Sequence, residues 1–301
     1  MRLLLATDGS EFSAAATQNV IAQVKREDTQ IRAIHVVDTR EGPLSPMTGL
    51  DKEVMNAPAQ RRSAEVLVEA TAELLRAAGL KATTAVVWGD PRSKIVEVAK
   101  EWHADLIVLG SQGRTGLKGF LMGSVSDAVV HNAACSVEIV RIPSCQPNPR
   151  SLRVLLAVDD SEYSQAAVNA VIAQVGPEGA EVKLLRVFEP LSLGDAAEMG
   201  IQQYPDFAAA IAKSRDQAIG ELLKTAEKLQ TAGFKVTHRL AEEGYPRDVI
   251  LDCSEQWGAG LIVLGSHARK GVRRLLMGSV SEAVSRYAAC STEIVRHRCD
   301  H

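Results

Sequence analysis

Two kinds of hydrophobic pattern alternate along the chain. Short apolar runs such as RLLLAT and DLIVLG are typical of buried strands, and segments with apolar residues every three or four positions are typical of amphipathic helices. Five strands alternating with four helices predict a parallel sheet covered on both faces. In the first half the predicted strands are 2–7, 31–37, 82–88, 105–110 and 136–141, and the predicted helices are 10–27, 59–79, 91–103 and 124–133.

The second half of the chain repeats the first. Residues 4–24 return at 155–175 with 14 of 21 positions identical, and residues 105–141 return at 260–296 with 24 of 37 identical. Between the repeats, RIPSCQPNPR holds three prolines, which favours an extended linker. We therefore predict two homologous domains, 1–143 and 150–301, joined by a linker at 144–149.

Two loops in each half differ from plain connections. In the first half they are TDGSEFS at 7–13 and GSQGRTGLKGFLMGS at 110–124, which holds five glycines. Ligands of open parallel sheets lie beyond the carboxyl ends of the strands, where the strand order reverses. In the order 3-2-1-4-5, strands 1 and 4 are neighbours, and both loops line one crevice.

The glycine-rich loop has the chemistry of a phosphate site. Gly110 and Gly113 can expose backbone N–H groups, and Gly123-Ser124 opens a helix whose free N–H groups favour an anion. Arg114 and Lys118 add positive charge, and Asp8 can accept hydrogen bonds from a sugar hydroxyl. The alternatives are an ordinary glycine turn and simple helix capping by Asp8, Ser10 or Ser124.

The glycine loop has the spacing Gly110-x-x-Gly113, nine residues, then Gly123-Ser124, and the first predicted strand and the loop after it contain LLATDGSEFS. In these two features the chain resembles the universal stress protein family, and the resemblance covers both halves. The resemblance implies a doubly wound 3-2-1-4-5 parallel α/β sheet in each half, of the adenine nucleotide alpha hydrolase-like type, with ATP bound between strands 1 and 4. Carried over by position, it implies the following nucleotide contacts in the first half: Asp8, Val36, Gly110, Gly113, Arg114, Gly123, Ser124 and Val125. The corresponding contacts in the second half are Asp159, Val187, Gly265, Arg269, Gly278, Ser279 and Val280.

The sequence departs from the family pattern in two places. Ala268 stands where Gly113 stands in the first half, so we expect the second site to bind nucleotide more weakly or differently. The last strands, CSVEIVR and CSTEIVR, carry Ser where family members commonly carry Pro. Because this strand often makes the dimer contact in the family, we expect strand 136–141 to pair with strand 291–296 inside one chain, and a homo-oligomer is a further option.

Composition narrows the functional class. A net charge of −3 argues against a nucleic-acid partner. The five scattered cysteines fit a reducing compartment, and no segment predicts a signal peptide or membrane span. We therefore expect a cytoplasmic protein. No P-loop, catalytic pair or persuasive metal cluster occurs. The leading hypothesis is an ATP-binding stress-signalling module, with or without Mg²⁺ on the phosphates. The alternatives are a slow ATP-hydrolysing, autophosphorylating or adenylyl-transfer enzyme, and a nucleotide-free interaction or holdase protein.

Overall fold

The chain folds into two compact units. The computed structural model describes residues 1–24, 29–39, 49–113, 122–142, 152–189, 204–267 and 277–296. One unit comprises residues 1–142 together with 291–301, and the other comprises residues 143–290. The last strand of the second repeat is therefore part of the first unit. The predicted linker, 144–149, lies outside the described residues.

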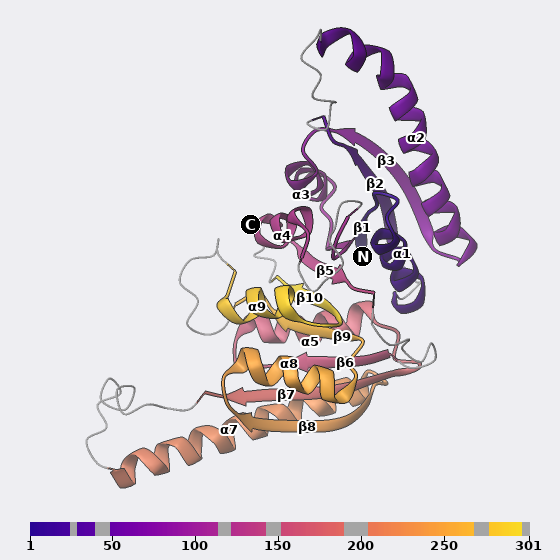
Figure 1. The fold of residues 1–301 in the computed structure, drawn as a ribbon. Coiled ribbons are helices and arrows are strands. Elements are labelled where there is room, and N and C mark those ends of the chain that lie inside the picture. The colour runs from indigo at the N-terminus through magenta and orange to yellow at the C-terminus, as the bar shows by residue number, and fades with distance from the viewer. Residues whose placement is uncertain are drawn as a thin grey trace. The chain divides into compact units, whose positions relative to one another are not determined.

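The first unit is an α/β sheet with helices on both faces. Its strands follow the order β3-β2-β1-β4-β5-β10, in which β1 to β5 are parallel and β10 is antiparallel to β5. Helices α1 and α2 cover one face, and α3 and α4 cover the other (Figure 1). The elements are β1 (Arg2–Ala6), α1 (Glu11–Gln23), β2 (Gln30–Val37), α2 (Gly49–Ala77), β3 (Lys81–Trp88), α3 (Pro91–Glu101), β4 (Leu106–Gly110), α4 (Ser124–Asn132), β5 (Ser136–Val140) and β10 (Ser291–Val295).

The second unit repeats this plan. Its strands follow the order β8-β7-β6-β9 and are all parallel, so the predicted order 3-2-1-4-5 is confirmed for both repeats. The elements are β6 (Leu152–Ala157), α5 (Glu162–Gln174), β7 (Ala180–Phe188), α7 (Tyr204–Thr231), β8 (Lys235–Glu243), α8 (Pro246–Trp257), β9 (Leu261–Gly265) and α9 (Ser279–Tyr287).

The core of the first unit lies between the central strands and α1. Leu3 and Leu5 of β1 are fully buried against Ala16 and Val20 of α1 and Leu75 of α2. Such close packing fixes the carboxyl ends of β1 and β4 beside the start of α1, which is where the sequence places the functional loops.

Helix α2 is longer than predicted. The glycines and prolines of segment 38–58 predict a loop, but α2 begins at Gly49 and passes through Pro58. Proline lacks the N–H that would bond the preceding turn, so it disfavours a helix interior without forbidding it. The sequence pattern therefore overestimated the length of the loop before α2.

The predicted pairing of the two last strands is confirmed. Glu138 of β5 faces its repeat counterpart Glu293 of β10. The Ser136 hydroxyl accepts the backbone N–H of Arg296 at 3.3 Å, and the Ser291 hydroxyl accepts that of Arg141 at 3.2 Å. Ser136 and Ser291 thus each supply a hydrogen-bond acceptor to the opposite strand.

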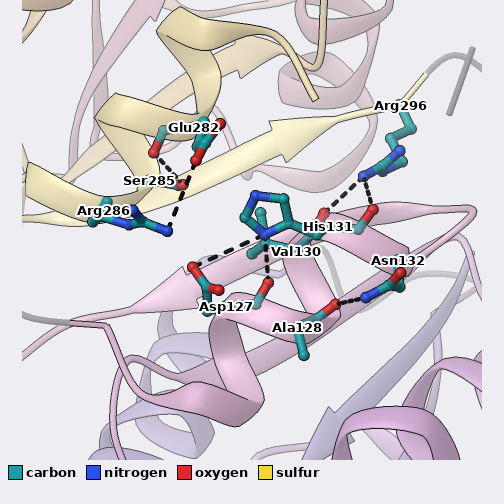
Figure 2. Close-up of polar contacts among 9 residues, drawn as sticks. All are labelled: Asp127, Ala128, Val130, His131, Asn132, Glu282, Ser285, Arg286 and Arg296. Atoms are coloured by element: carbon teal, nitrogen blue, oxygen red, sulfur yellow. Dashed lines mark hydrogen bonds and ion pairs between the residues drawn. The ribbon is translucent and has the colours of Figure 1, made fainter. Parts of the chain in front are cut away.

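Arg296, directly after β10, fastens this strand to α4. Its guanidinium donates to the carbonyl oxygens of Val130 at 2.7 Å and of His131 at 3.3 Å, in the last turn of the helix (Figure 2). The last carbonyl groups of a helix have no N–H donor within the helix. A cation at this end also interacts favourably with the negative end of the helix dipole. The contact joins the last residues of the second repeat to the first unit.

Candidate functional site at the carboxyl ends of β1 and β4

The two unusual loops of the first half leave the sheet side by side. β1 pairs with β4, with Leu5 in register with Val108, so the loops after both strands emerge at one edge. Ser126 of α4 donates its hydroxyl to the Gly110 carbonyl oxygen at 2.8 Å, which ties the start of α4 to the end of β4. This edge is the switch point at which open α/β sheets bind ligands.

Asp8 lies at the start of α1. One of its oxygens, Oδ1, accepts the Ser10 N–H at 3.0 Å, and the Ser10 hydroxyl caps α1 by accepting the Ser13 N–H at 3.2 Å. The other oxygen, Oδ2, faces the glycine loop, because a Cβ added to Gly113 would lie 2.8 Å from it. Asp8 therefore has a structural role in the turn and also presents an oxygen toward Gly113.

Gly110 has a packing reason to be glycine. A Cβ at this position would lie 2.7 Å from the carbonyl carbon and the Cβ of Phe12 in α1. In the second half, Gly265 has the same relation to Tyr163, also at 2.7 Å. Gly110 is therefore required by the close approach of α1, and the glycine pattern alone did not distinguish this contact from a bound anion.

The start of α4 has the features of an anion site. Gly123 is the N-cap and has no side chain to cap the helix, and its own N–H donates to the Ser111 carbonyl oxygen at 2.8 Å. The alternative that Ser124 is itself the N-cap is wrong, because Ser124 is the first helical residue. Among the described residues, no acceptor bonds the N–H groups of Ser124 and Val125. Two helix-terminal donors thus remain for a ligand at this edge.

The second half repeats the hydrogen bonds that hold these two loops in the first half. The Gly278 N–H donates to the Ser266 carbonyl oxygen at 2.9 Å, and Asp159 Oδ1 accepts the Ser161 N–H at 2.9 Å. Ser279 and Val280 open α9 as Ser124 and Val125 open α4.

An ion pair missed by sequence reasoning lies in the second half. Asp160 replaces Gly9 of the first half, and its Oδ2 lies 3.0 Å from Arg186 Nη2. Both residues line, with Asp159 and residues of α7, a cavity of about 600 Å³. The sequence did contain a signal for this ion pair, because Gly9 and His35 of the first half are replaced by an acid and a base in the second half. In the first half, His35 Nδ1 instead lies 2.7 Å from the Thr7 carbonyl oxygen.

The remaining predicted contacts are placed only in part. Val36 is nearly buried in β2 and Val187 is half-buried in β7, so each can offer only its backbone or part of its side chain. Arg114, Arg269 and Ala268 lie outside the described residues. In the part of the chain that the structure describes, no group of three His, Cys, Asp or Glu side chains could hold a metal, and no helix is long and apolar enough to cross a membrane.

Comparisons with known proteins agree with the repeat. The sequence profile of the universal stress protein family matches residues 1–141 and 151–296. Universal stress protein Rv2005c of Mycobacterium tuberculosis is 26% identical over 98% of this chain and 96% of its own length. Universal stress protein MJ0531 of Methanocaldococcus jannaschii is 36% identical over 47% of this chain and 82% of its own length. The crystal structure of a universal stress protein from Archaeoglobus fulgidus covers 100% of this chain and 97% of its own, at 23% identity and a TM-score of 0.66, which shows a shared fold.

Proposed function

The chain belongs to the universal stress protein family, as a tandem of two such domains, and from this premise we propose that its first half binds ATP as a stress-signalling module. The nucleotide lies between the loops after β1 and β4. The observation that carries the proposal is the start of α4, where the N–H groups of Ser124 and Val125 have no acceptor among the described residues. Adenine-nucleotide binding is typical of the family and agrees with this arrangement.

The described residues fit a nucleotide at both of its ends. The N–H groups and dipole at the start of α4 favour phosphate oxygens. A Cβ at residue 113 would lie 2.8 Å from Asp8 Oδ2, so a larger residue at this position would press against the carboxylate that we assign to the ribose. The carboxylate of Asp8 accepts ribose hydroxyls, and backbone groups at Val36 face the base. Mg²⁺, when present, neutralises the phosphates and is held by them.

A charge placed in the loop tests this site. Gly113→Asp sets a second carboxylate against Asp8 and the phosphates, and we expect the affinity for ATP to fall at least tenfold. The measurement is isothermal titration with ATP, together with the ATP-dependent rise in melting temperature. Gly176→Asp is the control, because a side chain at Gly176 meets no atom within 4 Å. Unchanged ATP binding in Gly113→Asp would contradict the proposal.

Ser124→Glu tests the same site with a change that should not destabilise the fold. Ser124 is exposed in the first turn of α4, where an acidic residue stabilises the helix by about 0.3–1 kcal/mol. Ser124→Glu should therefore keep or raise the melting temperature of the nucleotide-free protein and should still repel ATP. Ser279→Glu makes the same change in the second half. A loss of binding in Ser124→Glu only would assign the stronger site to the first half, as Ala268 leads us to expect.

A further inference from the structure

A second cavity lies at the other end of the first-half strands. It has a volume of about 460 Å³ and is lined at the amino ends of β2 and β3 by Gln30, Arg32, Arg76, Lys81, Thr83 and Trp102. Because β1, β2 and β3 are parallel, this end is a full strand length away from the loops that follow them. The volume is within the range of small-molecule sites.

Positive charge is concentrated on one face of this edge. In the strand register Arg2 faces Gln30, and Gln30 faces Lys81, so these three side chains form one row. Arg32 follows on the same face of β2, and its guanidinium lies 4.5 Å from the centroid of the Trp102 ring. Burial, and then the nearby charge of Arg2, lower the pKa of Arg32, as expected when a cation is held close to another cation.

Acidic neighbours neutralise only part of this charge. Glu69 pairs with Arg76 at 2.5 Å, and Asp105 accepts the backbone N–H of Arg2 at 2.7 Å. Within the described part of the chain, neither Arg32 nor Lys81 has an ion-pair partner. Their charges thus remain available to an anion in the cavity.

The second half provides a matched comparison. Arg153, Lys183, Lys235 and Trp257 stand where Arg2, Arg32, Lys81 and Trp102 stand in the first half, with the Lys183 ammonium 4.7 Å from the Trp257 ring centroid.

One residue of the row differs between the halves. Gln30 is replaced by Glu181, whose carboxylate lies 3.8 Å from Arg153 Nε and 3.6 Å from Lys235 Nζ. The second half therefore supplies its own anion to the row, and the first half has a neutral amide at that position.

We propose that the first half binds a small polyanion in the amino-end cavity, at the position that the Glu181 carboxylate occupies in the second half. The ligand is a small molecule with two or more negative charges on phosphate or carboxylate groups. Arginine recognises such groups with two parallel N–H bonds, and lysine adds a point charge. Because Lys81 and Arg2 are exposed, binding weakens as salt is added. The site is separate from the nucleotide crevice and does not depend on it.

The indole signals of the full-length protein test the proposal by nuclear magnetic resonance. Pyrophosphate and citrate, added separately at low ionic strength, serve as the phosphate and the carboxylate probe. We expect the Trp102 indole signal to shift with saturation for at least one probe, while Trp257 stays unchanged. Trp88 ends β3 at the carboxyl end, so it reports binding at the other edge of the sheet. A response to both probes indicates recognition by charge, and a response to one identifies the chemical group.

Two variants exchange the residue that differs between the halves. Gln30→Glu should weaken the Trp102 response at least tenfold, and Gln30→Ala, which adds no charge, should keep it within about threefold. Glu181→Gln should create a probe-dependent shift of Trp257. No Trp102 shift in the wild-type protein, or an equal shift in Gln30→Glu, would overturn the proposal. If Glu181→Gln produced no Trp257 response, that result would contradict the comparison of the two halves on which the proposal rests.

Discussion

At the residue scale, the glycine loop combines two different requirements. A methyl group on Gly110 would meet the backbone of Phe12, whereas a methyl group on Gly113 would meet the end of the Asp8 side chain. A backbone cannot move without shifting α1, but a carboxylate can rotate away. Position 110 is therefore limited to glycine by rigid backbone, and position 113 only by a side chain that can move.

We predict that Gly110→Ala lowers the free energy of unfolding by about 1–3 kcal/mol, since the added carbon overpacks the contact with α1. Gly265→Ala should have a similar effect through Tyr163. Urea denaturation measures both changes. Gly113→Ala is the control and should change stability far less, and an equal loss in all three variants would show that the packing argument is incorrect.

Residue-level prediction from the sequence succeeded where chemistry is local. Ser10 as a helix cap and Pro91 at the start of α3 are both found in the structure. The sequence could not separate Gly110 from Gly113, because glycine looks the same whether it admits a helix or a ligand. The Asp160–Arg186 pair was also missed, since its residues are distant in sequence and meet only through the alignment of β6 and β7.

At the element scale, the pairing of β5 with β10 places two acids opposite each other. Glu138 and Glu293 are 5% and 1% exposed, and like charges directly across a strand pair are destabilising. Burial raises the pKa of Glu138 to about 7, and the hydrogen bond from Asn19, 2.7 Å from its Oε1, opposes that rise. The folded state therefore holds a proton that the unfolded chain releases near the ordinary value of 4.5.

This shift predicts a pH-dependent stability. Because the pKa is raised on folding, the stabilisation is complete below about pH 4.5 and is lost as the pH rises through 7. We expect the free energy of unfolding of the wild-type protein to fall, relative to Glu138→Gln, by about 1–3 kcal/mol between pH 5 and pH 8. Denaturant titrations at several pH values measure it. Glu73→Gln, an exposed change on α2, is the control, and parallel curves for the wild type and Glu138→Gln would refute the assignment.

At the scale of the whole molecule, the sequence repeat made most of the fold predictable. The alternation of strands and helices, the strand order and the pairing of the last strands were all predictable, because duplicated sequence and parallel α/β topology leave few arrangements. Helix α2 was underestimated, because Pro58 was read as the end of a loop. The amino-end cavity was not predicted, since its cations come from separate strands and helices that only the register brings together.

We predict that residues 1–142 expressed alone self-associate. Without β10, β5 becomes an exposed edge, and its sequence SVEIV is nearly that of the strand it has lost, STEIV. A second copy can supply β5 in the same antiparallel register, with Glu138 facing Glu138. Analytical ultracentrifugation should detect dimers of the fragment. Glu138→Lys, which places two buried cations together, should reduce this association, and a fragment that stays monomeric at high concentration would disprove the prediction.

The membership of β10 in the first unit also has a consequence for synthesis. The ribosome makes this strand about 150 residues after β5. During translation the first unit lacks one strand of its sheet until β10 has left the exit tunnel. A stop codon before β10 therefore removes a strand from the portion of the protein that was made first.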